Sequence, residues 1–176
     1  RPLCPGPRGR KREIKEMPIF MRIEGIDGSA TAAGYERWFE LFSYSWGESN
    51  ASAALTGGGA GAGKVSMGDF FVMMPSGRGA PMLAYHCAAA RSLPAVQIHF
   101  ANATGEGLEP YQRWTLENVR ITSYQTGASA GDLPTDSVSL NFTKIKFEQA
   151  VQTPTGGVRY QEFHWDLRNS SGGQTP

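Results

Sequence analysis

The sequence predicts a mainly β fold: a compact β-barrel of two packed sheets with one flanking α-helix and a long Gly-rich loop. Three observations lead to this prediction. Glycine accounts for 22 of the 176 residues and aromatic residues for 11%, which is typical of β architectures with many turns. Apolar and polar residues alternate in most segments, as they do in half-buried strands. One stretch alone, residues 81–92, has convincing helical spacing.

The first three predicted strands cover residues 17–26, 35–46 and 64–74. The first alternates cleanly and ends at a Gly and an Asp-Gly turn signal. The second is rich in aromatic residues and apolar on both faces, as expected where a barrel wall also meets a partner. The glycine-rich loop, residues 47–63, separates the second strand from the third.

The predicted helix follows a Pro-Ser-Gly turn. Pro81 suits the first helical position, and Pro94 marks a point by which the helix has ended. A stripe at helical spacing comprises Leu83, His86, Cys87 and Ala90.

Four more strands are predicted, at residues 96–100, 111–124, 137–149 and 158–167. In the last three, the period-two pattern slips by one position partway along the strand. Such a slip indicates a β-bulge or a face that changes from solvent to contact. Three slips favour strongly curved strands and therefore a small barrel.

The charge is unevenly distributed along the chain. Residues 1–16 hold six of the 17 Lys/Arg and two of the 16 Asp/Glu, a balance of +4, which leaves 11 basic and 14 acidic residues, or −3, for residues 17–176. We interpret the basic segment as a leader outside the fold, without the apolar core of a secretory signal, and residues 17–176 as one domain. The mildly acidic domain gives no basic surface for nucleic acid.

The two cysteines are Cys4, in the leader, and Cys87. A single thiol in the predicted domain excludes an internal disulfide there, which suits folding in a reducing cytoplasm. No apolar run approaches the roughly 20 residues of a membrane span, so we expect a soluble protein without membrane insertion.

The segment GGGAGAGKVS, residues 57–66, nearly matches a nucleotide-binding loop. Gly58, Gly63 and Lys64 have the required spacing, but Val65 occupies the position of the magnesium-binding Ser or Thr. A phosphate site also needs a helix directly after the glycines, and the residues that follow alternate as a strand. We therefore interpret the run as a loop and not as an ATP site.

No residues combine into a catalytic or metal site. His86, His99 and His164 are far apart in the sequence, and adjacent His86 and Cys87 point in different directions on a helix. We predict no enzyme activity, no cofactor and no metal. Four tryptophans could form a binding platform but are more often core in a barrel of this size: Trp38, Trp46, Trp114 and Trp165.

The order of several motifs resembles the Hcp family, the haemolysin-coregulated tube subunits of bacterial type VI secretion. The motifs are IEGIDGSA, SYSWGESN, GGGAGAGKVSM, PMLAYHC, YQRWTLENVRITSYQTG and DSVSLNFTKIKFE, and they extend over residues 17–167. The chain departs from the family at residues 29–35, SATAAGY, where a charged segment is common, and in its leader.

The resemblance implies hexameric rings that stack into a tube, carry or chaperone effector proteins in the lumen, and work with spike, baseplate and sheath proteins. It implies assembly in the cytoplasm and export through the type VI apparatus without a signal peptide. It also implies that the long loop contacts a neighbouring subunit or ring. The predicted loop and anchor residues are Trp46, Gly47, Ser49, Asn50, Gly57, Gly58, Gly59, Gly61, Gly63 and Lys64.

Two alternatives remain open from the sequence. A phage-like contractile tail-tube protein would form the same kind of ring. A monomeric barrel that binds a small ligand or carbohydrate would instead present the tryptophans in an exposed cleft.

Overall fold

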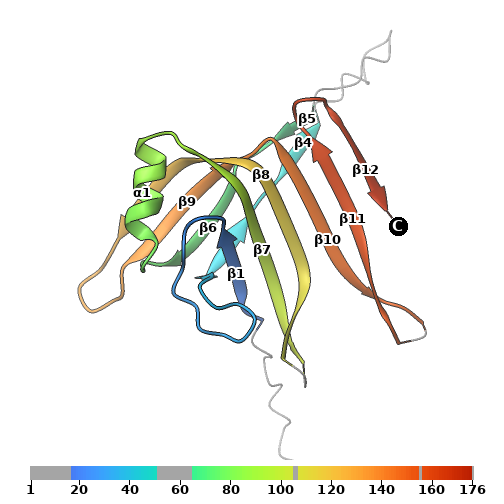
Figure 1. Cartoon of the computed structure of the whole chain (residues 1–176), viewed down its shortest axis with the longest axis horizontal. Helices are drawn as coiled ribbons and strands as arrows, with labels where there is room; N and C mark the ends of the chain where they lie inside the picture. The colour runs from blue at the N-terminus through green and yellow to red at the C-terminus, as the bar shows by residue number, and fades with distance from the viewer. Residues whose placement is uncertain (1–16, 51–64, 105–106, 155, 176) are drawn as a thin grey trace, which may run out of the picture.

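The computed structural model describes residues 17–50, 65–104, 107–154 and 156–175. These residues form twelve strands and one helix (Figure 1), which confirms the mainly β fold. In chain order the elements are β1 Ile19–Ile23, β2 Phe39–Leu41, β3 Ser43–Ser45, β4 Glu48–Asn50, β5 Val65–Met67, β6 Phe70–Pro75, α1 Ala80–Ala88, β7 Ser92–Thr104, β8 Gly107–Gly127, β9 Thr135–Asn141, β10 Lys144–Gln152, β11 Val158–Asp166 and β12 Ser171–Thr175.

The two packed sheets are arms of one curved ten-stranded sheet. One arm runs in the order β12-β11-β10-β8-β7-β1-β2, and the other branches from β8 through β9 and β6 to β3. Among the described strands the hydrogen-bonded path ends at β2 and β3 without closing. At that seam β2 lies against β6, and the chain passes from β2 to β3 through Phe42, whose N–H donates to the Met73 carbonyl of β6 at 2.8 Å. The short strands β4 and β5 form a separate two-stranded ribbon.

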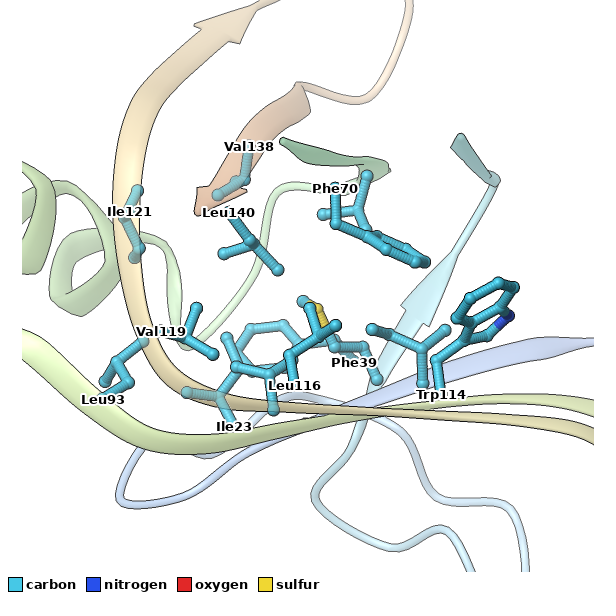
Figure 2. Close-up of a cluster of buried hydrophobic side chains, with 14 of the residues drawn as sticks. Ile23, Phe39, Phe70, Leu93, Trp114, Leu116, Val119, Ile121, Val138 and Leu140 are labelled. Carbon is cyan, nitrogen blue, oxygen red and sulfur yellow. The ribbon is translucent and has the colours of Figure 1, made fainter. Parts of the chain in front are cut away.

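Strand β8 makes the corner between the arms. Its first half pairs with β10 and its second half with β9, and Asn118 between them has a positive φ of 50°. Asn accepts this left-handed conformation more readily than most residues. Figure 2 shows β8 bending between Leu116 and Ile121 with its side chains on the concave side. The predicted phase slip in residues 111–124 therefore marks a real corner.

The other two slips have different causes. Residues 137–149 are not one strand: β9 and β10 are separated at Phe142, because the first pairs with the second half of β8 and the second with its first half. In residues 158–167 the β10–β11 register is continuous, so no bulge is present in this pair. Tyr160 and Phe163 simply occupy opposite faces, and each is half-buried.

Two predicted strands were too long because the chain changes arms within them. Residues 35–46 divide at Phe42 into β2, which pairs with β1, and β3, which pairs with β6. Residues 64–74 likewise divide into β5 and β6. The apolar phase shifts by one at each break, from Phe39 and Leu41 to Tyr44 and from Val65 and Met67 to Phe70 and Val72. Reading each segment as one strand missed that this shift marks a change of pairing partner.

The helix is shorter than predicted but begins as expected. It spans Ala80–Ala88 with Pro81 in the first turn, and Leu83 is fully buried against the sheet. Ala90 adopts a positive φ of 50°, so it lies outside the helix. Pro94 lies inside β7, and the helix has ended before it, as expected.

The main core fills the space between the two arms and the helix. Figure 2 shows its members converging from β1, β2, β6, β7, β8 and β9. Its fully buried side chains include Met21, Phe70, Leu116, Val138 and Leu140. Burying one large apolar side chain contributes about 1.5–3 kcal/mol, so this cluster supplies most of the driving force for folding.

Candidate functional site

The described part of the predicted assembly loop, residues 47–50, contains β4, which forms a ribbon with β5 at the start of the third predicted strand. The register of this ribbon pairs Glu48 with Met67, Ser49 with Ser66 and Asn50 with Val65. The Gly68 N–H donates to the Gly47 carbonyl at 3.0 Å and closes its root. All three residues of β4 are exposed. An isolated two-stranded hairpin is marginally stable in water, so the ribbon depends on what holds its root and on what covers it.

Five aromatic rings hold the root, and we call them the root cluster: Tyr44, Trp46, Phe70, Trp114 and Phe147. Trp114 is the centre, stacked on Phe147 at 4.1 Å and in contact with Trp46 at 5.4 Å between ring centroids. Phe70 lies 5.6 Å from Trp114 and 5.5 Å from Tyr44. Aromatic pairs at these separations add about 0.5–1.5 kcal/mol each beyond area burial. The cluster therefore fixes the direction in which the chain leaves the sheet.

A short hydrogen-bond chain continues the root cluster into the sheet. The Tyr44 hydroxyl donates to Gln112 Oε1 at 2.5 Å, and Gln112 Nε2 donates to Gln149 Oε1 at 2.7 Å. Burial raises the pKa of Tyr44, and the nearby Trp114 indole opposes the rise. Tyr44 is thus a protonated donor at neutral pH. It joins β3 to β8 and β10 across the core.

Three indole N–H groups, those of Trp46, Trp114 and Trp165, are buried without a hydrogen-bond partner among the described residues. The Trp114 indole influences the pKa of Tyr44 but does not meet hydrogen-bond geometry with it. An unsatisfied buried donor costs about 1–3 kcal/mol. The free energy gained by packing these rings must exceed this cost, so the rings are held strongly in place.

The structure separates the predicted site residues into three groups. Trp46 packs against Trp114 at the root, and its role as an anchor of the assembly loop remains a prediction. Ser49 and the predicted anchor Asn50 lie in the exposed ribbon, where Asn50 pairs through its backbone with Val65. Gly47 lies at the root of the ribbon, where its carbonyl accepts from Gly68, and the other predicted residues lie outside the described residues: Gly57, Gly58, Gly59, Gly61, Gly63 and Lys64. Their contact with a neighbouring subunit remains a prediction.

The other candidate residues occupy separate parts of the fold. His86 and Cys87 are on α1, His99 is in β7 and His164 is in β11. Cys87 packs against the core, and His164 Nδ1 lies 3.5 Å from Glu162. In the described part of the chain, no three His, Cys, Asp or Glu side chains gather where they could hold a metal ion.

His99 belongs to a second aromatic group, the loop cluster, formed by Phe20, Ala30, Tyr35, Trp38, His99 and Ala101. The hydroxyl of Tyr35 lies 3.3 Å from His99 Nδ1. Burial, together with the nearby Arg113 cation, lowers the pKa of His99 to about 4. The ring is therefore neutral at pH 7 and fills space on the outer face of β1 and β7. This cluster explains the departure at residues 29–35, whose Ala30 and Tyr35 are buried.

The tryptophans are packing residues. Trp38 and Trp114 are buried, and Trp46 and Trp165 pack against the main core. None of the four forms the exposed platform that a carbohydrate-binding barrel would need.

Sequence reasoning missed a network of ion pairs on the outer face of β8, β10 and β11. Lys146 Nζ lies 3.0 Å from Glu162 and 3.5 Å from Glu148, and Lys144 Nζ lies 3.6 Å from Glu117. The pKa of Lys146 is raised, chiefly by its hydrogen bond to Glu162. The alternation of charges in residues 144–148 was the available signal. No helix within the described ranges is long and apolar enough to cross a membrane.

The chain is similar to proteins of one secretion system. The family model described as "Type VI secretion system effector, Hcp" matches residues 20–149. "Protein hcp1" of Pseudomonas aeruginosa is 28% identical over 113 residues, covering 61% of this chain and 68% of that protein.

Solved structures agree with this match at the level of the fold. A structure described as a type six secretion system protein superposes with a TM-score of 0.80 at 19% identity, covering 90% of this chain and 100% of that chain. Hcp1 from Salmonella typhimurium gives a TM-score of 0.71 at 23% identity and covers 88% and 97%. A type VI secretion system effector from Yersinia pestis gives 0.69 at 20% identity and covers 84% and 98%.

Proposed function

Because the chain belongs to the Hcp family of type VI secretion proteins, we propose that it is a structural subunit of the inner tube. In this proposal, copies of the protein form hexameric rings that stack and carry effector proteins in the lumen. Residues 17–176 act as one domain, and residues 1–16 take no part in the fold. The protein works by contact and without catalysis.

The observation that carries the proposal is the exposed ribbon on a rigid root. The root cluster fixes the direction of the ribbon, yet Glu48, Ser49 and Asn50 bury no side chain within the subunit. A short ribbon held out from its sheet has little stability of its own. Contact with another subunit would cover its backbone and side chains, and this is the role we assign to residues 47–63.

The same proposal defines the partners and the route of the protein. Rings assemble in the cytoplasm, meet the spike, baseplate and sheath proteins, and leave through the apparatus. Membership of the Hcp family supports each of these steps.

Deletion of residues 51–62 tests the role of the loop. We expect the variant to fold as a monomer and to lose ring formation or stacking, because the ribbon can no longer reach its partner. Native mass measurement and light scattering distinguish these states. An equal-length Gly/Ser replacement is the control that separates loop length from loop sequence. Assembly of the deletion variant equal to that of the intact chain would contradict the assignment.

A further inference from the structure

The most exposed large apolar side chain of the described chain is Leu133, which is 83% accessible. It lies in the loop between β8 and β9, and this loop is ordered by its own contacts. The Asp132 N–H donates to the Ser129 carbonyl at 3.0 Å, and the Pro134 carbonyl accepts from Ser76 at 2.8 Å. Leu133 is therefore presented on a held loop. Presenting it to water brings the subunit no stability.

A hollow of about 850 Å³ lies elsewhere on the surface, between the ends of β7, β8, β10 and β11. Its apolar lining includes Tyr111, Val151 and Val158, which are all exposed large hydrophobic residues. The wall is braced, since the Tyr160 hydroxyl donates to the Pro110 carbonyl at 2.7 Å. The hollow is thus preformed and apolar enough to receive a leucine.

The two features lie on opposite sides of the subunit. Figure 1 shows the β8–β9 loop at one end of the long axis, and the ends of β10 and β11 toward the other. In a two-fold symmetric contact, the same surface patch of both copies meets. A projecting residue and a hollow on different sides of the subunit would therefore not meet in one small two-fold contact. They are suited to head-to-tail contact, which closes into a ring when the rotation permits.

Charge supports the same pairing. Asp132 is adjacent to Leu133, and Arg113 is the one cation among the described residues that line the hollow. The Arg113 guanidinium stacks over the Tyr160 ring at 4.1 Å and lies 4.0 Å from Glu148, with 34% of its side chain exposed. The acidic Glu109 is four residues away along β8, or about 13 Å. A carboxylate beside Tyr160 would lie close to Arg113, which already has Glu148 as a neighbour at 4.0 Å.

We infer that Leu133 of one copy inserts into the hollow formed by Tyr111, Val151 and Val158 of the next copy, with Asp132 facing Arg113. The inference rests on the proposed ring and identifies its lateral contact, which is separate from the loop at residues 47–63. The occupant of the hollow is a second copy of this chain.

Substitution of Leu133 gives the first test. Leu133→Asp should weaken ring association at least about tenfold, because a buried anchor residue becomes a charge, while Leu133→Met should assemble like the intact chain. Met82→Asp is the control for adding a charge at an exposed apolar position, since Met82 is 46% accessible and lies on α1. Circular dichroism of the monomer checks folding. An intact chain that never forms rings would overturn the proposed function, whereas normal rings from Leu133→Asp would overturn this contact alone.

Cross-linking gives a second test that does not depend on a damaging substitution. In a background with Cys4→Ser and Cys87→Ala, copies carrying both Leu133→Cys and Val158→Cys are treated with a short bis-maleimide. Head-to-tail contact predicts a covalent ladder that ends at the ring size, while either single-cysteine variant should stay monomeric. A Met82→Cys and Val158→Cys pair is the matched control. Rings that form without a ladder above this control would show that the hollow receives something else and would overturn the inference.

Discussion

The root cluster and the loop cluster consist of similar aromatic residues but have opposite effects on the segments they hold. The loop cluster folds residues 24–38 down onto β1 and β7, and its members Ala30, Tyr35 and Trp38 become buried. The root cluster holds only the beginning of the next loop, at Trp46, and leaves β4 exposed. The loop 24–38 is thus completed within the subunit. The ribbon is held at its root within the subunit, and its exposed residues remain available for contact with a partner.

Backbone contacts sharpen this difference. Within the loop, Gly28 and Ala30 donate to the carbonyls of Arg37 and Trp38 at 2.7 and 2.9 Å. Arg37 has a positive φ of 67°, a conformation that costs of order 1–3 kcal/mol. Its ion pair with Asp27 is largely exposed and contributes little. Burial of Tyr35 and Trp38 is therefore what offsets the strain.

Trp114→Ala should produce the largest effect, because it removes the centre of the root cluster. We expect a loss of about 3–5 kcal/mol in the free energy of unfolding, measured by urea denaturation, together with faster amide exchange in β4 and β5. Trp38→Ala is the matched control, since both rings are 8% exposed. It should lower stability by a similar amount without changing exchange in the ribbon. Equal exchange in the two variants would remove the distinction between the clusters.

Trp46→Ala should have a smaller effect on stability and a specific effect on the ribbon. Trp46 is only partly buried and carries an unsatisfied N–H, so we expect a loss of about 1–3 kcal/mol. Assembly should weaken, because the ribbon no longer leaves the sheet in a fixed direction. Light scattering measures this change. Trp46→Phe keeps the packing and removes the N–H, and it should assemble normally; failure of both variants alike would point to the indole N–H instead.

The smallest expected effect concerns pH and the loop cluster. The pKa of His99 is lowered to about 4 from 6.5, so between these values the unfolded chain binds a proton that the folded chain does not. The contribution of neutral His99 is fully present above pH 6.5 and declines as the pH falls toward 4. Because the ring is partly solvated, we expect a loss of about 1–2 kcal/mol over this range.

Urea midpoints at pH 7 and pH 5 measure this dependence. His99→Gln should reduce the difference between the two midpoints. The same pH dependence in the His99→Gln variant would mean that another group is responsible.

Much of the architecture could be predicted because alternation and turn residues act locally. Ile19, Met21 and Ile23 gave β1, and Pro81 gave the start of α1. The break at Phe42 was not predicted: the apolar phase shifts there from Leu41 to Tyr44, but the strands that β2 and β3 pair with lie far away in the sequence. Trp46 was predicted as an anchor, but its partner Trp114 is 68 residues away and no local pattern connects them.

Residue spacing along the chain was enough to predict a β-rich protein with one helix and a glycine-rich loop, and the order of its motifs indicated the family. These properties follow from spacing along the chain. Tertiary packing determines that the loop 24–38 is buried against the sheet while the ribbon of β4 and β5 remains exposed. It decided this because the sheet turns at Asn118 and brings Trp46, Trp114 and Phe147 together, while placing Leu133 and the hollow on opposite sides. Burial and exposure depend on such long-range pairings, which the period of a single strand cannot specify.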